Sequence, residues 1–136
     1  MPYLIGFVLA LGISVLARLV GLDRDRAFYP VVMIVIASYY GLFAIMGESA
    51  RALGVEVSIM LGFIVLSIVG FRSSLWLVAA ALAGHGILDF FHGRLVANPG
   101  VPTWWPAFCL AYDVTAAGYL AWLLRRSRLP ARAYTG

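Results

Sequence analysis

Two histidines bracket an aspartate in the segment HGILDFFHG, residues 85–93, of an otherwise apolar chain. On a helix that turns about 100° per residue, His85, Asp89 and His92 share one edge. Imidazoles and carboxylates are ligands of zinc and iron, and the same groups carry out acid–base catalysis. Because ionisable groups inside a membrane are costly and normally face the bundle interior, we expect this edge to point inward.

The spacing limits what one metal ion could hold. The three side chains span about 10 Å of helix axis, so one ion could take His85 with Asp89, or Asp89 with His92, but not all three. Asp113 or Glu48 would have to complete the ligand set. The metal hypothesis therefore covers His85, Asp89, His92 and Asp113, not all on one ion, with a divalent zinc or iron ion as cofactor. The acid–base alternative, with His85, Asp89 and Asp113 as catalytic residues, needs no cofactor.

The composition indicates a membrane protein. Of the 136 residues, 63% are hydrophobic and 12% are charged, whereas a soluble domain is roughly half apolar. The ten basic residues are all arginines at the ends of apolar runs. Membrane topology explains this distribution better than nucleic-acid binding, so we expect no nucleic-acid partner. The single cysteine, Cys109, excludes an intramolecular disulfide and is expected to be a small buried side chain.

Five apolar runs are long enough to cross a bilayer, which takes about 17–25 residues. They cover residues 3–22, 30–47, 55–71, 74–97 and 104–124, and the third is the shortest. We therefore predict an all-α fold in which residues 1–136 form a single transmembrane domain, a bundle of five helices. Stripes of small residues would let the helices approach closely and leave surfaces for self-association. The expected partners are thus the lipid bilayer and, as a homo-oligomer, further copies of the chain.

The arginines predict the orientation of the bundle. With the N-terminus outside and the C-terminus cytoplasmic, Arg51 and Arg94 lie on the outer side, and the other eight arginines, Arg132 among them, lie inside. In this orientation both histidines lie in the outer half of the membrane. Four of the six acidic residues are expected there with them: Glu48, Glu56, Asp89 and Asp113.

Helix geometry places these acids relative to one another. Asp113 lies about 13 Å below the start of its span, close to the predicted level of Asp89 and His85. The small-residue stripe of the second run continues to Glu48, which is therefore expected to face other helices. Glu56, at the start of the third run, is expected to be interfacial.

An inward-facing polar edge suggests a cavity beside it. We expect Glu48 and His92 near the entrance of this cavity, and the hydroxyl groups of Tyr39 and Tyr112 could line it. A buried histidine–aspartate pair can also serve only to tie helices together, and this structural alternative stays open.

Residues 83–122 carry the pattern H-G-x-x-D-x-x-H, then N-P, then an aspartate in the last span. This pattern resembles a group of small, uncharacterised bacterial multi-pass membrane proteins, although Gly93 stands where members of that group have a second histidine. The resemblance implies a multi-pass protein of the bacterial inner membrane.

Two better understood families resemble the chain at the level of site chemistry alone. Emopamil-binding sterol isomerases place a histidine and an acid four residues apart, as His85 and Asp89 are, and use buried acids to move protons on a lipid double bond. Alkaline-ceramidase-like membrane hydrolases hold zinc with three histidines, an aspartate and a serine, whereas this chain has two histidines.

The sequence thus predicts an enzyme embedded in the membrane that acts on a lipid-like or isoprenoid substrate, a hydrophobic small molecule. The reaction would be an isomerisation or cyclisation, or a metal-dependent hydrolysis. The alternative is a small transporter coupled to protons or metal ions. A third hypothesis is an accessory subunit with a structural polar cluster. Because ionisable residues gather in one half of the predicted bundle, a pocket is favoured over a path across the membrane.

Overall fold

The computed structural model describes residues 1–131 and is all-helical within that range. Its helices are α1 (Pro2–Val20), α2 (Phe28–Met46), α3 (Ala50–Arg72), α4 (Leu75–Leu95) and α5 (Trp105–Arg125). All five are long and apolar enough to cross a membrane, which confirms the predicted fold class of five transmembrane helices. The orientation of the termini stays a prediction, and Arg132 lies outside the described residues.

The third helix differs from its prediction. It is the longest of the five, with 23 residues, and begins at Ala50 rather than at residue 55. The hydroxyl of Ser49 accepts a hydrogen bond from the Ala52 backbone N–H at 3.2 Å and so caps the helix. The polar segment 48–54 looked like a loop because hydropathy cannot separate a capped polar first turn from a turn between helices.

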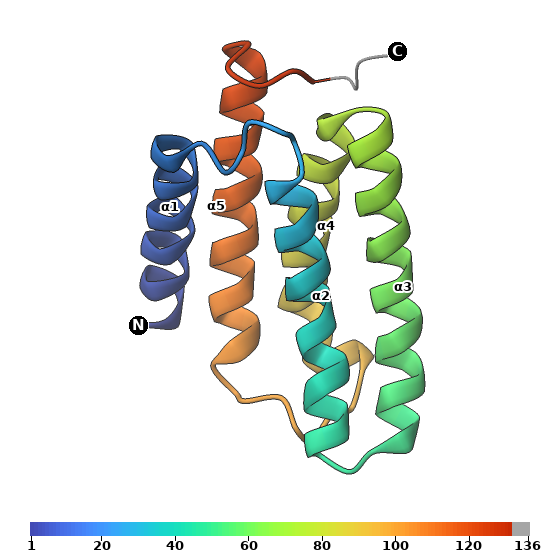
Figure 1. The fold of residues 1–136 in the computed structure, drawn as a ribbon. Coiled ribbons are helices and arrows are strands. Elements are labelled where there is room, and N and C mark those ends of the chain that lie inside the picture. The colour runs from blue at the N-terminus through green and yellow to red at the C-terminus, as the bar shows by residue number, and fades with distance from the viewer. Residues whose placement is uncertain (132–136) are drawn as a thin grey trace.

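The helices pack around α5 and α4 (Figure 1). Helix α1 packs against α5, which packs against α4, while α2 packs against α3 and α4. The turn at 47–49 and the connection at 96–104 meet at what we call the lower end, at the bottom of Figure 1. The connections at 21–27 and 73–74 lie at the opposite, upper end. Large apolar side chains remain exposed on every helix, as is expected of surfaces that face lipid.

Small residues set how closely α5 approaches its neighbours. Gly6 of α1 faces the backbone oxygen of Phe108 so closely that any side chain there would collide with it. A side chain at Gly86 of α4 would place its Cβ 3.2 Å from the Cβ of Asp113. The predicted close approach of helices along small residues is therefore confirmed here, and it brings α4 and α5 together at the level of Asp113.

Candidate functional site

A buried histidine lies between two carboxylates where α4 meets α5. The Nδ1 atom of His85 is 2.7 Å from Oδ2 of Asp113 and 3.4 Å from Oδ2 of Asp89. Each of the three residues is at most 1% exposed. We call them the central cluster. The predicted placement of Asp113 at the level of His85 and Asp89 is confirmed by these distances.

The helices position this cluster in simple ways. His85 and Asp89 are one turn apart on α4, so they lie on the same face, and Gly86 lets α5 approach that face. Aromatic rings from α2 and α3 pack against the imidazole. Phe63 of α3 meets it edge to face at 4.9 Å between ring centroids, and Tyr40 of α2 lies 6.0 Å away.

His92 belongs to a second, separate pair. Its Nε2 atom is 2.7 Å from Oε1 of Glu56, and Asn98 donates a 2.9 Å hydrogen bond to the same oxygen. We call Glu56 and His92 the peripheral pair. Glu56 is only 2% exposed, so the prediction that it is interfacial is wrong. Because α3 begins at residue 50, Glu56 lies well inside that helix and not at its start.

The predicted polar edge of α4 therefore serves two sites. His85 and Asp89 face Asp113, whereas His92 faces Glu56. Among the described residues, one group of three or more could hold a metal ion: His85, Asp89 and Asp113 offer ligand atoms within 4.8 Å of one another. No such group of described residues contains both Asp89 and His92, so the hypothesis that one ion binds these two residues is not supported.

The prediction that Glu48 faces other helices is wrong. Helix α2 ends at Met46, and the chain turns away at once, with Glu48 exposed in a left-handed conformation at φ 52°. The small-residue stripe of α2 therefore does not continue to Glu48. The acid that meets α4 in this half of the bundle is Glu56.

Several polar atoms of the central cluster and of the neighbouring Tyr40 make no close hydrogen bond among the described residues. They are both carboxylate oxygens of Asp89, Oδ1 of Asp113 and the hydroxyl of Tyr40. Buried polar atoms in folded proteins are nearly always hydrogen-bonded, so a group of such exceptions calls for an explanation. Glu56, by contrast, accepts from two side chains with the same oxygen.

Tyr40 connects the two sites, and sequence reasoning missed it. Its ring stacks on the imidazole of His92 at 4.1 Å, with 28° between the planes, and also neighbours His85. The buried stripe of α2 carried the signal, because Tyr40 follows Ile36 and Ala37 at helical spacing and all three are buried. Tyr39 instead points to the other side of the helix.

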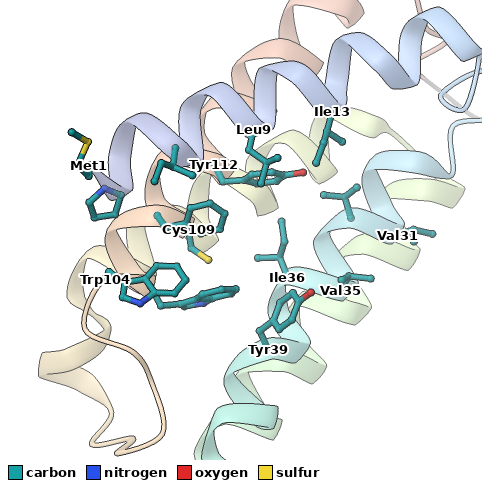
Figure 2. Close-up of a pocket in the computed structure, with 15 residues that line it drawn as sticks. Met1, Leu9, Ile13, Val31, Val35, Ile36, Tyr39, Trp104, Cys109 and Tyr112 are labelled. Atoms are coloured by element: carbon teal, nitrogen blue, oxygen red, sulfur yellow. The ribbon is translucent and has the colours of Figure 1, made fainter.

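A groove of about 780 Å³ lies on that other side, with walls from α1 and α2 and a floor from α5. Figure 2 shows the hydroxyl groups of Tyr39 and Tyr112 and the sulfur of Cys109 facing this space. Tyr39 and Tyr112 thus line this groove and not a cavity beside the polar edge of α4, because His85, Asp89 and His92 are not among the lining residues; Cys109 is buried, as expected. Asp113 directly follows Tyr112, so the floor of the groove and the central cluster occupy neighbouring positions on α5.

Comparisons of the chain with protein-family models, with curated proteins and with solved structures found no significant match. The resemblances stated above therefore stay predictions, and the function has to be argued from the site itself.

Proposed function

We propose that this multi-pass membrane protein is an enzyme that acts on a lipid-like or isoprenoid substrate. Its catalytic residues would be His85, Asp89 and Asp113. The observation that carries the proposal is an imidazole between two fully buried carboxylates, 2.7 Å from Asp113 and 3.4 Å from Asp89, with three of the four carboxylate oxygens outside any close hydrogen bond.

A purely structural role does not account for those oxygens. An unsatisfied buried polar atom costs about 1–3 kcal/mol, and an uncompensated charge in the membrane costs more. A structural tie between α4 and α5 would need one acid, as the peripheral pair does with Glu56 and His92. The second carboxylate approaches the same nitrogen of His85, where the two carboxylates repel each other. A proton or a cation between them would relieve this repulsion, so the cluster is suited to hold one.

The distances fit acid–base chemistry best. With one proton shared among His85, Asp89 and Asp113, the cluster presents a proton donor and a proton acceptor within a few ångströms of each other. Moving a double bond in a lipid takes one proton added and one removed. Such an isomerisation balances without a co-reactant.

The same three residues fit a divalent metal ion. A nitrogen and carboxylate oxygens are ligands of zinc and iron, and a catalytic zinc takes three protein ligands with one position left open. Bound there, the metal would supply an activated water and turn the site towards hydrolysis. The contact of 2.7 Å between His85 and Asp113 is a hydrogen bond and shorter than the separation of two ligands on one ion, so we place acid–base chemistry first.

The transporter alternative has one observation in its favour. The peripheral pair, Tyr40 and the central cluster form a series of ring and hydrogen-bond contacts towards the lower end. Above the cluster, however, the buried side chains of the described helices include the apolar Met33, Val78, Leu82 and Leu120 and the hydroxyl-bearing Ser14, Tyr29 and Ser67, but no acid or histidine. A path for protons or metal ions needs ionisable groups in both halves, so this arrangement favours a pocket.

We also propose that the upper end faces the cytoplasm of a bacterium. Arg18, Arg72 and Arg125 lie at the helix ends there, whereas Arg51 and Arg94 lie at the lower end. This distribution agrees with the excess of arginine on the cytoplasmic side of membrane proteins.

Deuterium incorporation tests the enzyme proposal without a known substrate. Protein in liposomes made from the total lipid extract of a bacterial host is incubated in deuterium oxide, and the lipids are analysed by mass spectrometry. We expect a lipid species that gains deuterium with the wild-type protein but not with His85→Gln or Asp113→Asn. Glu48→Gln, which changes an exposed acid outside the site, should behave as wild type. Equal labelling with all four proteins would contradict the proposal.

Metal content then decides between the two chemistries. If the site holds a metal, purified protein should carry about one zinc or iron ion per chain, lost in Asp89→Asn and retained in His92→Gln. A metal-free protein that still labels lipids supports acid–base catalysis. A metal that is lost in His92→Gln and kept in Asp89→Asn would move the site to the peripheral pair.

A further inference from the structure

We infer that the groove between α1 and α2 binds an uncharged lipid with one hydrocarbon chain and an oxygen-bearing end. This inference rests on the proposed function and names the substrate class of the same enzyme. It also implies that the substrate enters the protein from the membrane through this groove and not at the ends of the bundle.

The helix arrangement leaves this groove open. Helices α1 and α2 form opposite walls, yet α1 packs against α5, and α2 packs against α3 and α4. The volume of about 780 Å³ falls within the range of about 300–1,000 Å³ that small-molecule sites occupy. The walls are aliphatic, with Ile5, Leu9 and Ile13 on α1 and Val31, Val35 and Ile36 on α2. A hydrocarbon chain matches these walls.

Polar groups gather at the floor and the lower end of the groove. Tyr39 and Tyr112 direct their hydroxyl groups into this space (Figure 2). An apolar pocket with a few convergent polar groups is typical of a ligand site. These two hydroxyl groups call for an oxygen on the ligand that exchanges hydrogen bonds with them.

The lining side chains favour an uncharged end. No arginine, histidine, aspartate or glutamate is among the lining residues in the described chain, and the one lining residue with an amino group is Met1, at the start of α1. A phosphate beside Tyr39 and Tyr112 would lose its hydration without gaining a cationic side chain. An alcohol, ketone or ester oxygen needs only the hydrogen bonds that Tyr39 and Tyr112 could supply.

The groove borders the central cluster through Cys109. This residue lines the groove, is buried, and precedes Asp113 by one helical turn. A chain bound in the groove would therefore approach the carboxylates at Cys109.

Photo-crosslinking tests the inference with a defined probe. Protein in phosphatidylcholine liposomes is irradiated with octadecanol that carries a diazirine in its chain, and crosslinked peptides are mapped by mass spectrometry. We expect saturable labelling within residues 1–13, 31–39 and 104–112. Excess octadecanol should compete, whereas octadecyl phosphate should not. Labelling spread over the lipid-facing side of α3, without competition, would overturn the inference, and equal competition by octadecyl phosphate would overturn the uncharged class.

Matched variants locate the site. Val35→Trp fills the groove and should reduce specific labelling about tenfold or more, whereas Leu42→Trp on the same helix should not. Both residues are similarly exposed, at 45% and 48%, so neither substitution disturbs the core. Tyr112→Phe should weaken octadecanol binding about two- to tenfold, whereas Tyr3→Phe, at an exposed tyrosine outside the lining, should not change it. Unchanged labelling in Val35→Trp would place the probe elsewhere.

The central cluster separates this inference from the enzyme proposal. His85→Gln should keep the groove labelling and lose deuterium incorporation. If groove labelling is absent while deuterium incorporation still depends on His85, the groove inference fails and the enzyme proposal stands. If the groove is labelled but no lipid changes in any variant, the enzyme proposal fails and a lipid-binding protein remains.

Discussion

Asp89 and Glu56 are buried acids of the same bundle in opposite hydrogen-bonding states, and neutralising each one should affect stability differently. Glu56 accepts hydrogen bonds from His92 and Asn98 with one oxygen. Asp89 makes no close hydrogen bond among the described residues: its contact with His85 is 3.4 Å long, and the hydroxyl of the neighbouring Tyr40 is likewise without a close partner. The pair Asp89→Asn and Glu56→Gln therefore separates a site held ready for function from a structural tie.

The expected magnitude follows from the contacts. Hydrogen bonds to a charged group contribute about 1.5–3 kcal/mol, and neutral ones about 0.5–1.5 kcal/mol. Glu56→Gln keeps the shape but removes the charge from two such bonds, so it should lower the free energy of unfolding by about 2–3 kcal/mol. Asp89→Asn removes a carboxylate that repels Asp113 and adds an amide donor near the free oxygen of Asp113. It should leave stability unchanged or raise it by about 1 kcal/mol.

Unfolding in mixed micelles with increasing dodecyl sulfate, followed by circular dichroism, measures both differences. Glu48→Gln, at an exposed acid, is the matched control and should show no change. Deuterium incorporation into lipid gives a second measurement. The Asp89→Asn variant should lose this activity although its free energy of unfolding is not lowered. If Asp89→Asn destabilises the bundle as much as Glu56→Gln does, the central cluster is a structural tie and the reasoning for an enzyme is wrong.

Three further predictions concern packing, the peripheral pair and orientation. Gly6→Val should destabilise the protein by about 1–3 kcal/mol because its side chain meets the backbone of α5, whereas Gly12→Ala, which faces open space, should be neutral or stabilising; thermal melts in detergent check both. His92→Gln should lower stability without changing the chemical shift of the His85 imidazole nitrogens in ¹⁵N spectra, and a change in that shift would mean that the two sites are coupled. A reporter that is active only in the cytoplasm should work when fused after the C-terminus, and activity of a periplasmic reporter there would reverse the predicted orientation.

The bundle could be predicted from the sequence because hydrophobicity over a span is a local property. Four of the five helices lie within two residues of their predicted ends. The exception is α3, whose N-cap Ser49 is followed by Arg51 and Glu56 in its first two turns. Helix capping by Ser49 is a local signal too, but hydropathy does not detect it, and so Glu56 was placed at a membrane surface instead of inside the bundle.

The site could be predicted only in part because contacts between residues on different helices depend on two quantities together: the rotation of each helix about its axis and the depth of each residue along it. Asp113 was found because both spans were well delimited, and counting turns then gives a common level for Asp113 and His85. His92 and Asp89 share an edge of α4, yet a difference of three residues turns them towards α3 and α5 respectively. Glu48 was assigned to a helix face although α2 ends two residues before it. An error of two residues in a predicted helix end is thus enough to place Glu48, instead of Glu56, against α4.

The two histidines of α4 show why hydrogen-bond saturation, rather than residue type, separates the sites. Each imidazole meets a buried carboxylate at the same distance of 2.7 Å. At His92 the acid also receives an amide from Asn98, in the connection before α5, so its hydrogen bonds are made within the protein. At His85 a second acid takes the place of that amide, and its oxygens stay without donors beside a groove that opens to lipid. The first arrangement is what a structural tie needs, and the second is what the proposed catalytic site needs, so the two histidines can be tested against each other.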